Sequence, residues 1–408
     1  MERYSEYKDS GIKWLGEIPS HWEMLPGLAV FNENKEKNSD LAINTVLSLS
    51  YGKIVVKKDI DEGLVPAEYN TYQIVYPGYI IVRCTDLQND KVSLRTGLVK
   101  DKGIITSAYL GLVTSKKHNS SYIHYYLHAW DITKEIYRHG SGLRQSLSWL
   151  DLRRLPILIP PFDEQSAIAA YLDDATDKID AAIAQQQKMI DLLNERKQII
   201  INNAVTKGLN PNAKMKDSGV DWIGMVPEGW VVMRMRYLCS ITTGNKDTIN
   251  RVDDGLYPFY VRSPKVERIN TYSYDGEAVL MAGDGVGAGK VFHYVNGKFD
   301  YHQRVYNFYN IKKIKAKLLY YYMKSHFRYV IEQLSAKSTV DSVRLNMIQD
   351  FMVVIPPMQE QLDLIEFLDS QMKNLDDSIS MFEKQISFLQ ERKQIIVNDV
   401  VTGKVKVS

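Results

Sequence analysis

The sequence has only two cysteines among 408 residues, Cys84 and Cys239, and they lie in different segments. This excludes a disulfide framework and indicates no cysteine-based metal site, so both are expected to be small buried residues. Long hydrophobic runs are also lacking. No stretch approaches the roughly 18 uninterrupted apolar residues of a membrane span, and the polar first residues have no apolar core like that of a signal peptide. We therefore expect a soluble, cytoplasmic protein.

A strong net charge is lacking too, but the charge is unevenly distributed. Residues 211–355 hold 20 basic and 14 acidic side chains, and residues 1–160 hold 20 and 18. Residues 161–210 and 356–408 each have a net charge of −3. Basic blocks are expected of surfaces that bind phosphate, although the excess here is modest. The acidic blocks are not expected to face DNA, and 408 residues predict at least two domains.

Several segments of the sequence occur twice. KDSGIKWLG at 8–16 returns as KDSGVDWIG at 216–224, and each copy continues through a proline to a tryptophan. ERKQII at 195–200 recurs unchanged at 391–396, and an Ile-Pro-Pro followed by Glu-Gln precedes each copy. The stretches between these borders, 23–155 and 231–350, show little resemblance. A repeated frame with two different inserts predicts one mechanical role performed twice and a separate role for each insert.

Each frame segment after the Pro-Pro pair is predicted to be a long helix. Apolar residues recur every seven positions, as in a coiled-coil seam, and Gly208 and Gly403 lie near the predicted helix ends. About 40 residues would span roughly 60 Å. A lone helix would leave its seam exposed, so we expect the two to pair antiparallel; the alternative is that each packs only on its neighbouring domain. The predicted seam residues are Leu172, Ile179, Leu193, Ile200, Leu368, Leu375, Phe382, Leu389 and Ile396.

Both inserts are expected to be α+β domains. Strand-like runs such as 73–82 and 278–283 are broken by Gly, Pro, Asn and Asp, and short helices are expected at 121–138 and 315–333. The predicted architecture is therefore α+β, with two globular domains separated by a pair of long antiparallel coiled-coil helices in a pseudo-two-fold internal repeat. Its borders are placed at 1–158, 159–210, 211–354 and 355–408.

A glycine-rich string, GDGVGAGK at 283–290, superficially resembles a nucleotide-binding loop. A Walker A loop requires Gly-x4-Gly-Lys-Ser/Thr, but Asp284 stands at the first glycine position and Val291 follows the lysine. A Rossmann loop is disfavoured because a strand-like run, 291–295, follows where a helix should begin. We expect a tight turn, either structural or shaped to let the backbone approach DNA.

Two further motifs are misleading. Ile159-Pro160-Pro161-Phe162 is one residue away from the Asn/Asp-Pro-Pro-Phe/Tyr signature of amino-methyltransferases, but isoleucine cannot accept a hydrogen bond from the target amino group. His124 and His128 have a spacing that could hold a metal ion on a helix, but no third ligand is evident and aromatic residues surround them. No catalytic residue and no metal site are predicted.

Polar and basic side chains in the insert loops have the chemistry needed to contact DNA. Arg and Gln can contact guanine and adenine with two hydrogen bonds each, and Ser, Thr and Lys suit phosphates. Each position alone could equally be a solvated surface residue. The predicted DNA-binding residues are Arg83, Lys91, Arg95, Arg144, Gln145, Ser146, Lys246, Arg262, Lys290, Gln303, Arg304, Lys337, Thr339, Ser342 and Arg344.

Taken together, the frame resembles the specificity subunits (HsdS) of type I restriction-modification systems. The resemblance covers essentially the whole chain and rests on the Lys-Asp-Ser-Gly to Trp segment, the Pro-Pro and Glu-Gln pair, and the Glu-Arg-Lys-Gln to Val-Thr segment, in both copies. The glycine string through Arg304 is similar to one common type of target recognition domain. Departures are small: Lys207-Gly208 becomes Gly403-Lys404, and Phe382 stands where the first helix has Gln186.

The resemblance implies a non-catalytic subunit that recognises double-stranded DNA. Residues 1–158 and 211–354 would be target recognition domains, each reading one half of a bipartite target in the major groove, and the helices would be spacers. The implied partners are two methyltransferase subunits docked on the helices and two ATP-driven restriction subunits. This chain would need no cofactor, and S-adenosylmethionine, ATP and Mg would act in the partners.

The main alternative is a protein-interaction scaffold whose two inserts bind proteins rather than DNA. The modest positive charge of the inserts argues only mildly against it. Binding to DNA that weakens steeply with added salt would favour the DNA-reading role.

Overall fold

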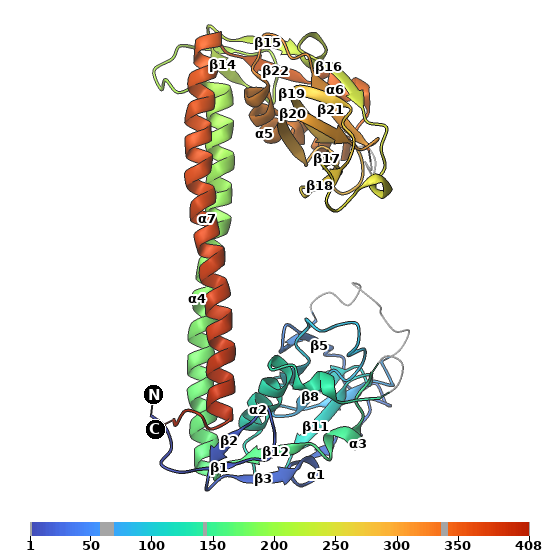
Figure 1. Ribbon diagram of the computed structural model, residues 1–408, viewed down its shortest axis with the longest axis vertical. Helices are drawn as coiled ribbons and strands as arrows, with labels where there is room; N and C mark the ends of the chain where they lie inside the picture. The colour runs from blue at the N-terminus through green and yellow to red at the C-terminus, as the bar shows by residue number, and fades with distance from the viewer. Residues whose placement is uncertain (1, 58–68, 142–144, 336–341, 408) are drawn as a thin grey trace. The chain divides into compact units, whose positions relative to one another are not determined.

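The computed structural model describes residues 2–57, 69–141, 145–335 and 342–407, which form two compact units. The first unit comprises Met1–Gln186 with Lys384–Ser408, and the second comprises Gln187–Glu383. Each unit therefore holds one globular domain, the beginning of one long helix and the end of the other (Figure 1). In the part of the chain that the structure describes, none of the helices could span a membrane.

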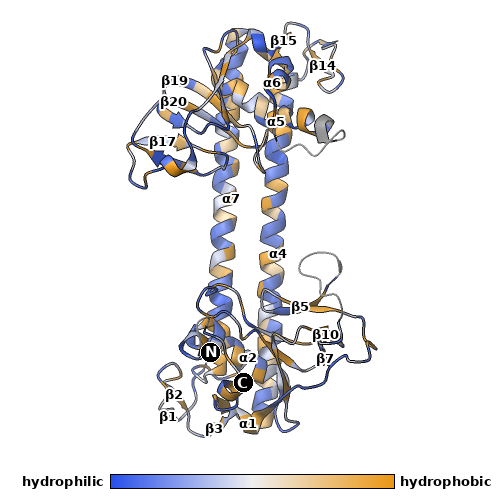
Figure 2. Cartoon of the chain, turned by 90° about the vertical axis from the view of Figure 1, so that its right-hand side faces the viewer, coloured by the Kyte–Doolittle hydropathy of each residue, from blue (hydrophilic) through white to orange (hydrophobic). Residues whose placement is uncertain are grey.

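Two long helices carry the chain from one unit into the other. Helix α4, Phe162–Lys207, has 46 residues, and α7, Met358–Val401, has 44. Gly208 follows α4 with φ 74° and Gly403 follows α7 with φ 73°. This left-handed conformation is common just beyond a helix end and favours glycine there. Figure 2 shows hydrophobic residues interspersed with hydrophilic ones along both helices, as the heptad pattern predicts.

The helices run antiparallel within each unit. Lys393 of α7 donates to Asp180 of α4 over 2.6 Å in the first unit, and Lys197 of α4 pairs with Asp376 of α7 in the second. The predicted antiparallel pair is therefore confirmed. The seam residues differ in burial: Leu172, Ile179, Leu368 and Leu375 are buried, whereas Leu193, Ile200, Phe382, Leu389 and Ile396 are half-buried.

The first domain consists of short strands in several small sheets. A hairpin of β1 (Tyr7–Asp9) and β2 (Glu17–Pro19) precedes β3 (Glu23–Pro26), which pairs with β12 (Pro156–Ile159), so the chain enters and leaves the domain side by side. The other sheets are β4 (Phe31–Glu33), β11 (Leu110–Thr114), β8 (Ile80–Val82) and β9 (Thr96–Leu98) in that order, β5 (Leu47–Ser50) with β6 (Lys53–Val56), and β7 (Gln73–Val75) with β10 (Gly103–Ile105). The helices are α1 (Gly27–Val30), α2 (Ser120–Ile132), η1 (Glu135–Arg138) and α3 (Trp149–Leu152).

The second domain is built on one larger sheet. Its entry repeats the first domain, with a hairpin of β13 (Met215–Asp217) and β14 (Met225–Pro227) and with β15 (Val231–Arg234) paired to β22 (Met352–Ile355). The six-stranded sheet has the order β16 (Ser240–Thr243), β21 (Val305–Tyr309), β19 (Tyr274–Ala282), β20 (Phe292–Tyr301), β17 (Tyr257–Tyr260) and β18 (Val266–Ile269). The helices are η2 (Met235–Tyr237), η3 (Thr248–Asn250), α5 (Ala316–Ser335) and α6 (Leu345–Asp350).

The glutamine of each Glu-Gln pair fastens a long helix to its domain in the same way. Gln165 accepts from the backbone N–H of Asn119 at 2.9 Å and donates to the carbonyl of Pro160 at 2.8 Å. Gln361 repeats this with Lys315 and Pro356, both at 2.8 Å. Each glutamine thereby joins the start of a long helix to the start of α2 or α5.

Tyrosines on α2 and α5 repeat as well. Tyr125 donates to Asp173 at 2.7 Å, and Tyr321 donates to Asp369 at 2.8 Å. The hydroxyls of Tyr126 and Tyr322 likewise donate to the first residue of β12 and of β22. Although 23–155 and 231–350 show little resemblance in sequence, α2 and the beginning of α5 make the same contacts and belong to the repeated frame. The sheets are what differ.

Some predicted elements have different bounds in the structure. The run 73–82 is two strands in separate sheets, because the turn after β7 includes Gly78 with φ 90°. The helix expected at 121–138 ends at Ile132, since Lys134 adopts a left-handed φ of 64° and η1 follows. Cys84 is buried and Cys239 is half-buried, and neither is in a disulfide.

Candidate nucleic-acid interface

Two arginines of the second domain share one carboxylate. Arg262 Nη1 donates to Asp284 Oδ1 at 3.1 Å, and Arg304 Nε lies 3.5 Å from Asp284 Oδ2. The Asp284 side chain is 19% exposed, against 46% for Arg262 and 62% for Arg304. The carboxylate therefore orients both guanidinium groups while much of each remains accessible to a ligand.

The chain around Arg304 brings Gln303 and Lys246 to the same surface. The backbone N–H of Gln303 donates to the Lys246 carbonyl at 2.8 Å, and Gln303 Nε2 donates to Asp247 Oδ2 at 2.8 Å. Buried His302 accepts from the backbone N–H of Arg304 through Nδ1 at 2.9 Å. Burial lowers the pKa of His302, which favours the neutral ring that this contact requires. Four of the predicted DNA-binding residues, Lys246, Arg262, Gln303 and Arg304, thus belong to one network.

The glycine-rich string forms a tight turn beside this network. Gly285 and Gly289 have φ of 67° and 61°, and a Cβ at Gly287 would lie 2.4 Å from the Arg262 carbonyl. Val286 at the turn is 96% exposed, and Lys290 is exposed as well. Strand β20 follows the turn, whereas a Rossmann loop would be followed by a helix.

The segment before α6 approaches the same turn. Ser342 forms an isolated antiparallel bridge with Asp284, and the backbone N–H of Val343 donates to the Gly283 carbonyl at 2.7 Å. Ser342 and Arg344 are exposed. Lys337 and Thr339, also predicted to bind DNA, lie outside the described residues.

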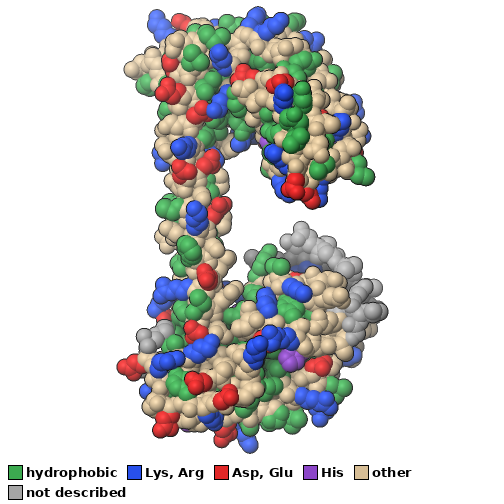
Figure 3. Space-filling view, in the orientation of Figure 1, with side chains coloured by type: hydrophobic (Ala, Val, Ile, Leu, Met, Phe, Trp, Pro, Cys, Tyr) green, Lys and Arg blue, Asp and Glu red, His purple; other side chains and the backbone are tan. Residues whose placement is uncertain are grey.

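In the first domain, Arg83 pairs with an acidic residue of a neighbouring loop. Its Nη1 lies 3.1 Å from Asp90 Oδ2. Hydrogen bonds from Ser93, assisted by the charge of Arg83, lower the pKa of Asp90 to about 2. Lys91 and Val92 follow on the exposed part of this loop. As in the second domain, a predicted DNA-binding arginine is oriented by a carboxylate next to an exposed valine. Figure 3 shows basic and acidic side chains interspersed over the surfaces of both domains.

Arg95 requires a correction. Its side chain is fully buried, and the guanidinium group donates to the carbonyls of Thr85, Asp86 and Asp90, among others. The group is therefore occupied inside the protein, where it holds the loop that presents Lys91. The prediction that Arg95 contacts DNA is wrong, because a basic residue in a polar loop can serve as the internal anchor of that loop.

Gln145 and Ser146 lie in a loop closed by their own hydrogen bonds. Gln145 Nε2 donates to the carbonyls of Tyr137 at 2.7 Å and His139 at 3.0 Å, and Ser146 bridges Ser141. A two-bond contact between Gln145 and adenine would require one of these bonds to break. Arg144 lies outside the described residues.

His124 and His128 are neighbours on α2, with ring centroids 6.0 Å apart. Burial lowers the pKa of His124 to about 3 and that of His128 to about 4, so both are neutral near pH 7. Within the described part of the chain, no group of three His, Cys, Asp or Glu residues is placed to hold a metal ion. These histidines pack the helix against its domain.

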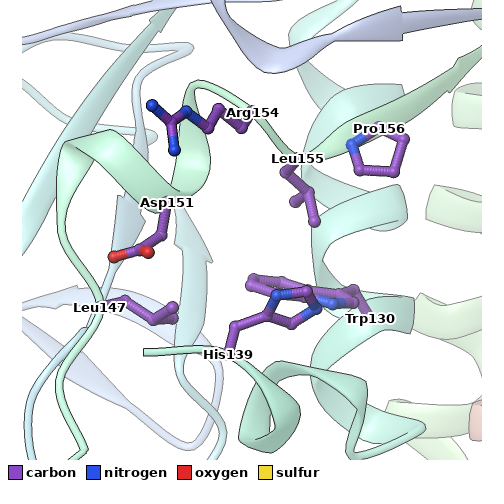
Figure 4. A pocket seen from close by; sticks show the side chains of 7 residues that line it. All are labelled: Trp130, His139, Leu147, Asp151, Arg154, Leu155 and Pro156. Carbon is purple, nitrogen blue, oxygen red and sulfur yellow. The ribbon is translucent and has the colours of Figure 1, made fainter. Parts of the chain in front are cut away.

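A small cavity of about 250 Å³ lies elsewhere in the first domain (Figure 4). The rings of Trp130 and His139 pack at 5.4 Å on one side of it, and Asp151 and Arg154 lie on another. None of the predicted DNA-binding residues that the structure describes lines it. It adjoins the loop of Gln145 and Ser146, because Gln145 donates to the carbonyl of His139, which lines the cavity.

The residues that orient the predicted DNA-binding side chains were not predicted from the sequence. These are Asp90, Asp247, Asp284 and His302. An acidic residue disfavours DNA contact when it is considered alone, and its distant partners are visible only in the fold. Position within the glycine string was the one local signal that could have drawn attention to Asp284.

Comparisons with known proteins agree with this architecture. Residues 50–190 and 227–386 match the family model described as the type I restriction modification DNA specificity domain. The chain is 28% identical over 180 residues to the type I restriction enzyme EcoDI specificity subunit of Escherichia coli, covering 44% of this chain and 39% of that subunit. It is 24% identical over 331 residues to the MjaVIII specificity subunit of Methanocaldococcus jannaschii, covering 75% of each.

The fold is also found among solved structures. A chain from work on complex assembly and conformational transition of the type I R-M system aligns with a TM-score of 0.69 at 14% identity, covering 95% of this chain and 99% of that one. The two family matches fall on the two domains and the adjoining helices. The chain therefore belongs to the type I restriction-modification specificity family, whose members recognise DNA without a catalytic centre of their own.

Proposed function

We propose that this subunit reads a bipartite, asymmetric DNA target, with one half-site for each recognition domain. The observation that carries this proposal is the repeated frame around two unlike sheets, four-stranded in the first domain and six-stranded in the second. A frame that repeats its contacts residue for residue would present each domain to DNA in the same way. Because the two domains differ in their sheets, they would read different DNA sequences. We retain 1–158 and 211–354 as the domain borders, with 159–210 and 355–408 as the spacer helices.

The proposed DNA-binding surface of the second domain is the Arg262, Asp284 and Arg304 network with its flanking polar residues. In the first domain it is the loop of Arg83 and Lys91. The guanidinium groups of arginine can form paired hydrogen bonds with base edges, and lysine side chains can contact phosphates. Each domain therefore has groups for both kinds of contact. The remaining proposed contacts are Gln145, Ser146, Lys246, Lys290, Gln303, Ser342 and Arg344, with Arg144, Lys337 and Thr339 retained from the sequence alone.

The long helices have exposed apolar residues at matched positions. Leu192 and Ile199 of α4 are 48% and 52% exposed, and Phe388 and Ile395 of α7 are 68% and 51% exposed. Phe388 and Ile395 lie 196 residues after Leu192 and Ile199, so each unit carries one copy of the surface. Hydrophobic side chains are visible on the helices in Figure 3. A duplicated apolar surface fits two copies of one partner.

We therefore propose that two methyltransferase subunits dock on these helices and that restriction subunits join them. S-adenosylmethionine, ATP and Mg would be bound by those partners. The assembly would act on chromosomal DNA in the cytoplasm. Replacing Leu192 and Ile199 with alanine should weaken capture of one methyltransferase subunit at least tenfold, by the magnitude typical of interface anchors. Replacing Leu256, 70% exposed on the second domain, is the matched control.

DNA binding by the reconstituted complex tests the proposed function against the scaffold alternative. The family assignment does not favour a scaffold. Sequence-specific affinity that falls steeply between about 50 and 200 mM salt is expected for a protein that neutralises several phosphates. Salt-insensitive binding, or none in the presence of the methyltransferase partner, would contradict the DNA-reading role.

A further inference from the structure

Asp284 is an acidic side chain in the middle of a surface proposed to bind an anion. A carboxylate facing phosphates or the acceptor edges of guanine would repel them, so its presence there requires a reason. Two ion pairs explain its presence, because Asp284 Oδ1 pairs with Arg262 and Asp284 Oδ2 pairs with Arg304. The Arg-Asp-Arg group keeps a net positive charge, and the carboxylate is its least exposed member.

The hydrogen-bonding capacity left on each arginine defines what the group can read. A guanidinium group has five N–H donors in a fixed plane. Arg304 faces Asp284 through Nε, which leaves its two Nη groups together as an end-on fork. Such a fork matches O6 and N7 of guanine in the major groove. Arg262 uses Nη1, which leaves Nη2 and Nε for further contacts.

The backbone around the carboxylate fixes its position. The Gly283 N–H donates to the Arg304 carbonyl at 2.8 Å, so Asp284 and Arg304 extend from adjacent, bonded strands. Ser342 bridges Asp284 from the other direction, and His302 holds the Arg304 N–H. A guanidinium group held before DNA arrives loses less conformational freedom when it binds a base.

We propose that Asp284 is a positioning residue that determines specificity, and that the arginine pair it holds reads guanine in the half-site of the second domain. This inference rests on the proposed function. It predicts at least one required guanine, on either strand, in that half-site. The side chain of Asp284 acts through Arg262 and Arg304 and does not itself contact the base.

The test uses the full subunit assembled with its methyltransferase partner. The complex selects from double-stranded DNA in which the second half-site is randomised, and bound sequences are counted. For Asp284→Asn, preference for guanine at the affected position should fall about tenfold or more, the range expected when a two-bond arginine contact is lost. The first half-site should be unchanged. Asp254→Asn removes the same charge from an exposed position of the same domain and should have no effect.

Two further variants separate positioning from general damage. Arg304→Lys keeps the charge but cannot form the fork, so it should lose guanine preference while total affinity falls less. In the background of Arg262→Ala with Arg304→Ala, Asp284→Asn should cause no further change. A further loss in that background, or an unchanged guanine preference in Asp284→Asn, would overturn the inference. A wild-type half-site without guanine would also overturn the inference, but it would leave the proposed function intact. Absence of any sequence-specific binding would contradict the proposed function itself.

Discussion

Lys393 and Asp180 join the two long helices of the first unit through a hydrogen bond of 2.6 Å. Asp180 also accepts from Lys53 of the first domain at 2.6 Å, so one carboxylate connects both helices with the domain. The helix link recurs in the second unit between Lys197 and Asp376. These positions lie 196 residues from their counterparts, and the repeat therefore extends to individual ion pairs between the helices.

Replacing Lys393 with alanine should loosen the end of α7 in the first unit. Both side chains are about one quarter exposed, and we expect a loss of about 1 kcal/mol in local stability. Faster hydrogen exchange near residue 393 with no change near residue 197 would support the link. An equal increase in exchange along the whole of α7 would contradict it.

Burial alone would raise the pKa of Asp180, but Lys393 and Lys53 together lower it. The link should therefore be fully present above about pH 4 and weaken below it.

Substitutions of Arg95 and Lys91 should have opposite consequences. Arg95→Ala leaves several partly buried carbonyls without donors and should destabilise the first domain by about 2–4 kcal/mol. Lys91→Ala should leave thermal stability unchanged, weaken binding to all DNA sequences alike and reduce the salt slope by about one. Thermal melting and salt-dependent DNA binding measure the two effects. A Lys91 variant with altered target sequence would show that this lysine reads bases.

Acid should destabilise the first domain through its histidine pair. His124 and His128 have folded-state pKa values of about 3 and 4, below the ordinary value near 6.5, because burial disfavours the charged rings. The unfolded chain thus binds more protons between about pH 4 and 6.5, and stability falls as the pH falls through that range. Asp131, whose pKa burial raises to about 6, opposes the trend in part.

Hydrogen exchange of α2 at pH 7 and pH 5 measures this dependence. Protection should decrease on acidification by the equivalent of about 1 kcal/mol, and His124→Gln should reduce the decrease. His139→Gln, at an exposed histidine of the same domain, is the control and should leave the dependence unchanged. A dependence that survives the loss of both helix histidines would assign it to another group.

Inserting four residues after Gln186 and after Phe382, which are matched positions, should lengthen the gap between half-sites. Four helical residues add about 6 Å, a little under two base pairs at about 3.4 Å each. Both half-sites should keep their sequences, which identifies the helices as the spacer. The same insertion in the loop 209–214 should leave the gap unchanged. Altered half-sites with an unchanged gap would contradict the spacer role.

Periodicity and repetition predicted the parts of the fold that depend on local pattern. The heptads specified both long helices, and the KDSG and Glu-Gln borders located the repeat. The sequence predicted less about residues whose role depends on their surroundings in the fold. Arg95 and Arg83 look alike in sequence, yet one is buried and the other half-buried. Tyr125 and Tyr321 lie 196 residues apart within segments of otherwise different sequence, and only their hydrogen bonds to Asp173 and Asp369 identified them as part of the frame.

Two different domains are proposed to read two independent half-sites. The decisive measurement is sequencing of the methylated bases in a host that carries this chain and its partners. The wild-type subunit is compared with a subunit that carries both Arg262→Ala and Arg304→Ala. We predict a bipartite, asymmetric motif with a fixed gap, in which the double substitution alters one half and leaves the other half and the gap intact. A single contiguous motif, or changes in both halves at once, would show that the two domains do not read independent half-sites.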